Sequence, residues 1–284
     1  MLLCQKTFVV PVTSHLFLLS LHKFRTMISK AKLKYIHSLE RKKNRKEEGV
    51  FVAEGPKVVG DLLEVMPAKM VVATSDWWNR QSFRLKDAET IEVTDEELRK
   101  VSFLQHPQEV LAVFPQREVS ASFDVNQCAI ALDDVQDPGN LGTIIRIADW
   151  FGIEKIFCSE NTADVYNPKV IQATMGSIAR VDVVYADLLE LIDSLPVGYP
   201  VYGTFLDGES IYSKPLTPNG LIVMGNEGNG ISPQVAERVN RRLLIPNFPE
   251  GRVTADSLNV AIATAITCAE FRRQMIMNDS HSMI

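Results

Sequence analysis

The sequence predicts an α/β protein with a parallel sheet, preceded by a smaller α/β domain. From Cys128 onward, strand-like apolar runs alternate with helical patterns. Such alternation requires crossover connections, which place parallel strands beneath helices on both faces of a sheet. A polar stretch at 116–127, rich in Ser, Asp and Asn, separates this region from a shorter alternating pattern before it and is typical of a linker. The 284 residues are long enough for two modest domains.

The first domain is expected at 27–115. Leu33, Ile36 and Leu39 recur every three residues and predict one apolar face of a helix. Basic residues follow at its C-terminal end and in the loop beyond it. The remaining elements expected here are a strand at 50–53, a helix at 56–65, a strand at 70–73, a short helix at 95–100 and a strand at 110–114.

The second domain is expected at 128–275, with a tail at 276–284. Apolar runs predict strands at 128–134, 154–158, 181–185, 200–205, 220–224 and 243–246. Helical patterns fall near 140–151, 168–178, 186–194, 233–241 and 258–274. In open parallel sheets, ligands bind beyond the carboxyl ends of the strands. We therefore expect the ligand-binding and catalytic residues in the polar loops that follow the strands.

Residues 1–26 fit neither domain and are interpreted as an extension. The apolar run at 7–21 is too short and too often interrupted by polar residues to span a bilayer. It is not followed by the small-residue cleavage site of a signal peptide. We expect the functional protein to begin near Met27. The helix at 258–274 contains Thr and Glu residues that also make it unsuitable as a membrane span.

The net charge is −5, from 30 basic and 35 acidic residues, and by itself argues against a nucleic-acid-binding protein. The charge is uneven, however. Residues 30–46 contain eight basic residues and one acidic residue, a local charge of +7, which leaves 22 basic against 34 acidic residues elsewhere. This segment suits RNA phosphates, although a solvated helix face is the alternative. The candidate RNA contacts are Arg41, Lys42, Lys43, Arg45 and Lys46.

Four cysteines lie far apart without C-x-x-C spacing, which argues against a structural metal site. We expect buried, reduced thiols in a cytoplasmic protein. The five histidines never pair at the spacing of metal ligands or of a general base. No metal and no histidine-based catalysis are therefore expected.

The first polar loop runs into the helix at 140–151. Asn140 is placed to cap this helix, and Gly142 allows the backbone to approach a ligand closely. Apolar residues flank Arg146 in the sequence, so we expect a half-buried guanidinium that requires a carboxylate or phosphate partner. A structural arginine paired within the core is the alternative.

The second loop, in LIVMGNEGNGIS at 221–232, places Glu227 among three glycines. The glycine spacing is neither G-x-G-x-x-G nor that of a P-loop, so the signatures of those nucleotide sites are missing. Glycines do expose backbone groups to a small ligand, and a plain turn is the alternative. In the third loop, Ser257 is placed to cap the last long helix, whereas Asn259 has no such obvious structural role.

Taken in order, the three loops resemble the motifs of the SpoU (TrmH-like) family of RNA ribose 2′-O-methyltransferases. Asn140, Gly142 and Arg146 match its first motif, N-x-G-x-x-x-R. GNEGNGIS matches the second, and IP…SLNVAIATAI matches the third. The likeness covers about 128–274. More loosely, 28–114 resembles, through KNRKEEGVFVAEG, the ribosomal-protein-like RNA-binding domain that precedes the catalytic domain in many members.

This resemblance implies a SPOUT-like α/β fold with a C-terminal trefoil knot, S-adenosylmethionine as methyl donor, and a homodimer that acts on tRNA or rRNA. It implies that the cofactor is bound by Thr204, Gly225, Ile245 and Leu258. The catalytic residues implied by the motifs are Asn140, Arg146, Glu227, Ser257 and Asn259.

Methyl transfer from a sulfonium needs no metal, but the ribose hydroxyl must be in line with the methyl group and must lose its proton. Because arginine stays protonated in proteins, we interpret Arg146 as a phosphate anchor that stabilises the developing alkoxide. Its role as the base stays open. Two other classes also stay open, an inactive RNA-binding protein of the same fold and a cofactor-dependent enzyme acting on a small molecule. An inactive RNA-binding protein does not require the catalytic residues implied by the motifs, and an enzyme acting on a small molecule does not require the basic segment at 30–46.

Overall fold

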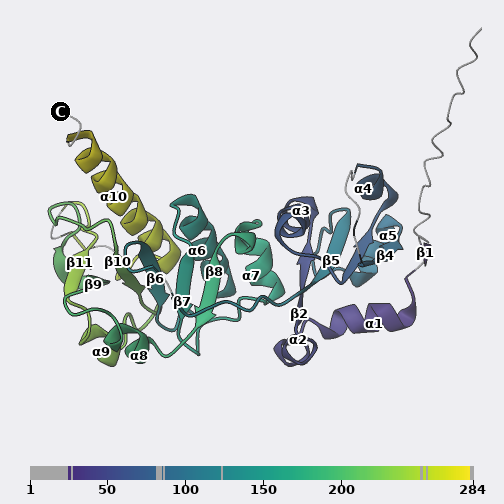
Figure 1. Ribbon diagram of the computed structural model, residues 1–284, viewed down its shortest axis with the longest axis horizontal. Coiled ribbons are helices and arrows are strands. Elements are labelled where there is room, and N and C mark those ends of the chain that lie inside the picture. The colour runs from purple at the N-terminus through teal and green to yellow at the C-terminus, as the bar shows by residue number, and fades with distance from the viewer. Residues whose placement is uncertain are drawn as a thin grey trace, which may run out of the picture.

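The computed structural model describes residues 25–26, 28–80, 85, 87–122, 124–249, 252–253 and 255–281. It consists of two α/β domains that lie side by side along the long axis of the molecule (Figure 1). Residues 1–24 and Met27 lie outside the described part, so a functional start near Met27 stays a prediction.

The N-terminal domain contains a five-stranded mixed sheet in the order β1-β4-β3-β5-β2. Only β5 runs antiparallel to its neighbours β3 and β2. The strands are β1 (Arg25–Thr26), β2 (Val50–Glu54), β3 (Met70–Ala73), β4 (Glu89–Glu92) and β5 (Val110–Pro115). The helices are α1 (Lys30–Ser38), α2 (Lys42–Glu48), α3 (Pro56–Val65), α4 (Ser75–Arg80) and α5 (Asp95–Val101). The elements expected in this domain are confirmed. The short α4, β1 and β4 were missed.

The basic stretch after α1 is a helix, α2, rather than the loop we expected. Gly49 ends this helix in the left-handed conformation, at φ 61°. Arg45 lies on the inner face of α2 and is 2% exposed. Its guanidinium donates to the carbonyls of Leu39 and Glu40 at 2.8 and 2.6 Å and pairs with Asp164 of the second domain. A buried guanidinium requires such partners, and Arg45 is therefore not available to RNA.

The second domain contains a six-stranded sheet in the order β11-β9-β10-β6-β7-β8, with all neighbouring strands parallel. The strands are β6 (Cys128–Leu132), β7 (Lys155–Cys158), β8 (Asp182–Tyr185), β9 (Val201–Ser210), β10 (Gly220–Met224) and β11 (Arg241–Leu244). All six expected strands and the parallel sheet are confirmed.

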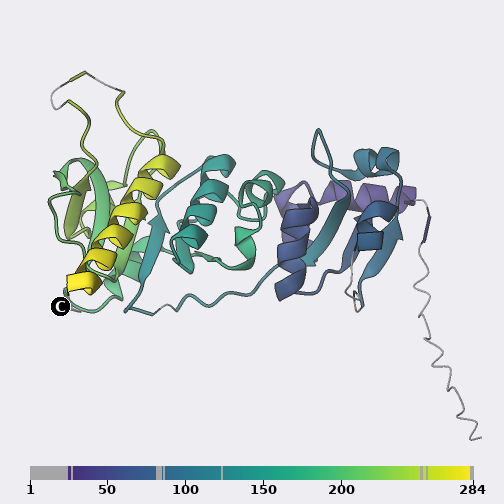
Figure 2. The ribbon, with the colours of Figure 1, turned by 90° about the horizontal axis from the view of Figure 1, so that it is seen from above.

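Helices cover both faces of this sheet, as the alternating pattern predicts. One face carries α6 (Pro138–Trp150), α7 (Pro168–Ala173) and α10 (Val260–His281), and the other carries α8 (Leu188–Asp193) and α9 (Pro233–Ala236). Figure 2 shows α6 and α10 together on the same face. Helix α10 continues through the expected tail as far as His281. None of the helices in the described residues is long and apolar enough to cross a membrane. The trefoil knot stays a prediction.

The helix expected at 168–178 breaks after Ala173. Met175 and Gly176 adopt positive φ angles of 51° and 95°, and a short 3₁₀ turn, η1 (Ser177–Ala179), follows. A Cβ on Gly176 would lie 2.4 Å from Oδ2 of Asp61 in α3. The break therefore allows the N-terminal domain to approach closely, and only glycine fits at this contact.

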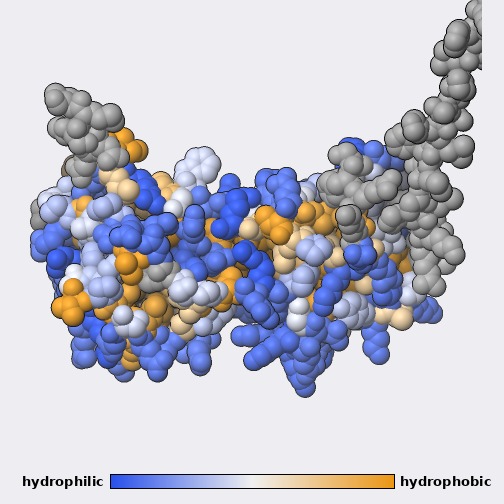
Figure 3. Space-filling model, viewed as in Figure 1, coloured by the Kyte–Doolittle hydropathy of each residue, from blue (hydrophilic) through white to orange (hydrophobic). Residues whose placement is uncertain are grey.

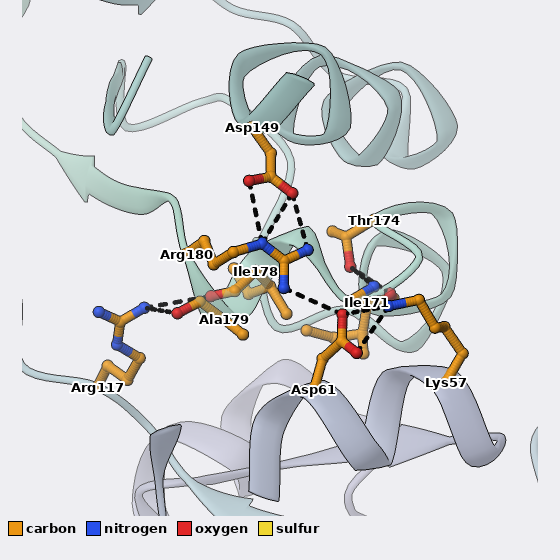
Figure 4. A network of polar contacts seen from close by, with 10 residues as sticks. Lys57, Asp61, Arg117, Asp149, Ile171, Thr174, Ile178, Ala179 and Arg180 are labelled. Atoms are coloured by element: carbon orange, nitrogen blue, oxygen red, sulfur yellow. Dashed lines mark hydrogen bonds and ion pairs between the residues drawn. The ribbon is translucent and has the colours of Figure 1, made fainter. Parts of the chain in front are cut away.

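Charged groups join the two domains at this point (Figure 4). The Arg180 guanidinium donates to both carboxylate oxygens of Asp149 in α6, at 2.8 to 3.0 Å, and to Oδ2 of Asp61 in α3, at 3.1 Å. Lys57 donates to the same Asp61 carboxylate at 2.7 Å. One arginine thus connects the first helix of the second domain to a helix of the N-terminal domain.

Three of the four cysteines fall in the described residues, and all three are buried free thiols, as expected. They are Cys128, Cys158 and Cys268. Burial raises the pKa of each thiol, that of Cys128 to about 11. Buried thiols with raised pKa values are unreactive, so they belong to the core rather than to a catalytic centre.

Candidate active site

The three polar loops meet at one edge of the six-stranded sheet. They follow β6, β10 and β11, and these strands end at the same edge because β11, β9, β10 and β6 are parallel neighbours. Three segments that are far apart in the sequence thereby form a single site, as expected for an open parallel sheet.

Asn140 does not cap its helix, contrary to our expectation. Asp137 is the N-cap, and its carboxylate accepts from the backbone N–H of Asn140 at 2.8 Å because Pro138 starts the helix two residues earlier. The Asn140 amide is therefore free to bridge two other loops. Its Nδ2 donates to Oε1 of Glu227 at 2.8 Å, and its Oδ1 accepts from Nδ2 of Asn259 at 2.9 Å.

Asn259, Asn140 and Glu227 are linked by these hydrogen bonds, and Asn259 is held in place by the start of α10. Its Oδ1 accepts from the backbone N–H groups of Ala261 and Ile262 at 3.0 and 3.3 Å, which makes it the cap of α10. Ser257, expected as the cap, lies two residues too early and is exposed. The capping bonds fix the Asn259 oxygen, so its amide nitrogen points to Asn140.

Glu227 is positioned by a tight glycine loop. The side-chain oxygen of Asn226 accepts from the N–H groups of Gly228 and Asn229 at 2.9 and 3.0 Å, and its Nδ2 donates to the carbonyl of Asp134 at 2.7 Å. Asn226 thereby ties the β10 loop to the loop after β6. We did not predict this role for Asn226, although an asparagine directly after a strand in a glycine-rich turn is a known signal for it.

A cavity of about 470 Å³ opens beside these loops, within the usual range for small-ligand sites. Its lining includes all four residues expected to bind the cofactor, namely Thr204, Gly225, Ile245 and Leu258, and also Glu227 and Ser257. The fit at Gly225 depends on glycine, since a Cβ would lie 2.2 Å from the carbonyl carbon of Gly230.

Backbone groups are available to a ligand in this cavity. Within the described part of the chain, the amide and carbonyl of Ile245 and of Leu258 make no hydrogen bond. Phe205 also lines the cavity and was not expected there. The guanidinium of Arg242 lies over its ring, 3.5 Å from the centroid, and such a cation–π contact holds an aromatic wall in place.

Two expectations for α6 are wrong. Arg146 is exposed rather than half-buried and does not line the cavity. The neighbouring Ile144, Ile145 and Ala148 are buried, because the helical phase turns them toward the sheet and Arg146 away from it. Gly142 allows a close approach to α7, where a Cβ would lie 2.5 Å from the Ala173 side chain, rather than the open backbone that we expected.

The basic segment presents four of its five candidate residues to solvent. Arg41, Lys42, Lys43 and Lys46 are exposed, and Arg45 is the buried exception. The described residues contain no group of three or more His, Cys, Asp or Glu side chains that could bind a metal ion.

Residues 127–269 match the family model described as the SpoU rRNA Methylase family. The chain belongs to this family. A second match, over residues 30–112, is to a model described as an MRM3-like substrate binding domain. The SpoU resemblance inferred from the three motifs is thus confirmed.

Similar proteins include the 23S rRNA (guanosine(2553)-2′-O)-methyltransferase RlmP of Bacillus subtilis, 30% identical over 245 residues, which cover 85% of this chain and 96% of RlmP. Human mitochondrial rRNA methyltransferase 3 is 26% identical over 81% of this chain and 69% of its own length.

Two solved structures agree in fold. A protein from Porphyromonas gingivalis, described as an RNA methyltransferase of the TrmH family, is 41% identical with a TM-score of 0.79, over 87% of this chain and 99% of that one. An AdoMet-bound rRNA methyltransferase from Sinorhizobium meliloti is 30% identical with a TM-score of 0.77, over 88% and 98%.

Proposed function

We propose that this protein transfers a methyl group from S-adenosylmethionine to a ribose 2′-hydroxyl of structured RNA, either tRNA or rRNA. The observation that carries the proposal is the hydrogen-bonded chain Asn259–Asn140–Glu227 beside a cavity lined by the expected cofactor residues. The related methyltransferases named for 2′-O methylation of rRNA, and the AdoMet-bound structure, support the reaction and the cofactor.

The cavity fits this cofactor through backbone groups. Ile245 and Leu258 offer amides and carbonyls that are unpaired in the described chain, Gly225 gives close access to the loop, and Thr204 adds a hydroxyl. When bound, S-adenosylmethionine supplies a methyl group on a positively charged sulfur, so the reaction requires no metal. The residues of this chain then have to orient the ribose and stabilise its oxygen.

The side chains divide these tasks. Glu227 and Asn259 fix the two ends of the Asn140 amide, which leaves that amide rigid beside the cavity. The exposed Ser257 hydroxyl lies on the cavity wall, where it can bind the ribose. Arg146 acts as a phosphate anchor and stabilises the oxygen as it becomes negative, because a protonated guanidinium binds such oxygens well.

A homodimer explains why Arg146 lies outside the cavity of its own chain. One helical turn further along α6, Trp150 is 84% exposed, and Ile262 on the adjoining α10 is 52% exposed. Exposed large apolar side chains beside a functional arginine are typical of an interface. In such a dimer, Arg146 of each copy would reach the site of its partner.

The N-terminal domain contributes RNA affinity through Arg41, Lys42, Lys43 and Lys46. Each phosphate contact releases a counterion, so binding should weaken steeply with salt. The free buried thiols suit a reducing compartment, and we place the protein in the cytoplasm.

The test is transfer of a labelled methyl group from S-adenosylmethionine to total tRNA or rRNA by the full chain, with the products mapped for 2′-O-methyl ribose. Arg146→Ala should lower turnover by more than about 100-fold while calorimetry shows unchanged cofactor binding. Mixing Arg146→Ala with Asn140→Ala should restore activity, because a mixed dimer has one intact site. RNA binding without any methyl transfer would favour the inactive alternative and refute the proposal.

A further inference from the structure

A second cavity, of about 500 Å³, lies between the two domains. One wall is β2 with the turn after α5, and the other is α7, the catalytic-domain helix nearest to the N-terminal domain (Figure 1). The lining residues that matter here are Glu54, Phe103, Leu104, Lys169, Ile171 and Gln172. In the space-filling view, a hydrophobic patch lies over the middle of the molecule, where the domains meet (Figure 3). We call this cavity the interdomain cleft.

The two walls of the interdomain cleft are fixed relative to each other. Asp164, which precedes α7, pairs with the buried Arg45 of the N-terminal domain. Arg180, which follows α7, pairs with Asp61 of that same domain. The segments on both sides of α7 are therefore attached across the domain boundary. The cleft is preformed, and a ligand does not have to order it.

Glu54 provides a carboxylate in this cleft that has unused hydrogen-bonding capacity. It is 5% exposed, and it accepts from the backbone N–H of Phe103 at 2.8 Å and from the Ser102 hydroxyl. A carboxylate can accept about four hydrogen bonds. Burial raises the pKa of Glu54 despite these two donors, because desolvation disfavours the charged form. A ligand with further N–H donors would compensate for that desolvation.

The remaining lining also includes the exposed carboxylate of Glu40, and the part of it formed by the turn after α5 and by α7 suits a planar ring and a phosphate. Phe103 and Leu104 are half-buried and offer apolar surface from the N-terminal domain, and the buried Ile171 offers it from α7. Lys169 is exposed at the first turn of α7 and supplies a positive charge. Proteins read unpaired RNA bases through this combination of apolar or aromatic contact and hydrogen bonds to the base edge.

The position of α7 connects this cleft to the candidate active site. A Cβ on Gly142 would lie 2.5 Å from the Ala173 side chain, so α7 and α6 are in direct contact. Asn140 is only two residues from Gly142 on α6. A nucleotide in the cleft is therefore one helix away from the Asn140 amide beside the proposed cofactor cavity.

From this geometry we infer that the interdomain cleft binds an unpaired nucleobase of the RNA substrate, with Glu54 accepting hydrogen bonds from the base edge. Guanine fits best, since its N1–H and N2–H donors lie side by side and match the two oxygens of a carboxylate. Phe103 packs against the base, and Lys169 contacts its phosphate. This inference rests on the proposed function, because it makes RNA the occupant.

The test compares full-length variants in the methyl-transfer assay. Glu54→Gln replaces one of the two acceptor oxygens of the carboxylate with an NH₂ donor. Gln172→Trp fills the cleft from a half-exposed position, so it should not disturb folding. Each should raise the KM for RNA by about tenfold, as expected for the loss of a paired base contact, with kcat and cofactor affinity unchanged. Lys169→Ala removes the proposed phosphate contact and should also raise the KM for RNA, whereas its control Lys69→Ala, at an exposed lysine outside the cleft, should leave the KM unchanged.

A second measurement does not depend on catalysis. In NMR titrations, GMP should shift the resonances of Phe103 and Lys169 in the wild type and not in Gln172→Trp, and UMP should shift them less. If the variants keep the wild-type KM, or if GMP shifts nothing near the cleft, the inference is overturned while methyl transfer stands. If the wild type transfers no methyl group to RNA, the proposed function fails, and the GMP titration alone decides whether the cleft binds a base.

Discussion

Replacing Asn140 with alanine tests the central element of the site. The change removes the hydrogen bond to the Glu227 carboxylate at 2.8 Å and the one to Asn259 at 2.9 Å. A bond to a charged group contributes about 1.5–3 kcal/mol and a neutral one about 1 kcal/mol. Water reaches these partly exposed side chains, so the loss summed over both bonds should lie near the lower end of these ranges, at about 2–3 kcal/mol. At about 1.4 kcal/mol per tenfold, kcat/KM for RNA should fall by about 30- to 150-fold.

The assay is steady-state methyl transfer to RNA, with cofactor affinity measured in parallel by calorimetry. Asn140→Ala should leave the cofactor Kd within about twofold, because Asn140 does not line the cavity. Asn140→Asp keeps the acceptor for Asn259 but sets a carboxylate against Glu227, so its activity should partly recover toward pH 5. Asn126→Ala, in an exposed turn of the linker, is the matched control. A fall in kcat/KM of less than threefold for Asn140→Ala would refute the role of the hydrogen-bonded chain Asn259–Asn140–Glu227.

Three further predictions concern stability. Gly142→Ala places a Cβ 2.5 Å from a side chain of α7 and should cost about 1–3 kcal/mol in urea unfolding, whereas Gly60→Ala meets nothing within 4 Å and should not destabilise. Burial raises the pKa of Glu54, so the wild-type protein loses stability as the pH rises through that pKa and the carboxyl ionises. Glutamine does not ionise, so the Tm of Glu54→Gln relative to that of the wild type should rise from pH 4 to pH 8. A difference in Tm that stays constant over this range would contradict this. The hydrogen bond from Arg180 lowers the pKa of Asp149, and hydrogen bonds from Lys57 and Arg180 lower that of Asp61 despite its partial burial. Arg180→Ala should therefore cost about 1 kcal/mol at pH 7, and this cost should disappear once the pH falls below both lowered pKa values. A pH-independent cost would contradict this.

Local pattern was sufficient for most of the fold. Strands β6, β7, β8 and β10 are short and mostly apolar runs, and all six strands of the second sheet overlap their expected places, although β9 continues through polar residues to Ser210. Helix ends were less accurate. Pro138 moved the start of α6, and positive φ angles at Met175 and Gly176 divided the helix expected at 168–178. At Gly176 the backbone lies directly against Asp61 of the other domain, and no local pattern contains that contact.

The order of the three motifs determined the family and the members of the candidate site. Only tertiary structure decided how those members are used. Asn140 and Asn259 are 119 residues apart, as are Arg45 and Asp164. No local sequence pattern indicates that the first pair is joined by a hydrogen bond or that the second pair removes an arginine from the RNA-binding surface. A sequence encodes periodicity and charge, whereas a hydrogen-bond partner is set by packing between distant segments. For the same reason, the exposure of Arg146 and the cleft beside Glu54 became visible only in the folded chain.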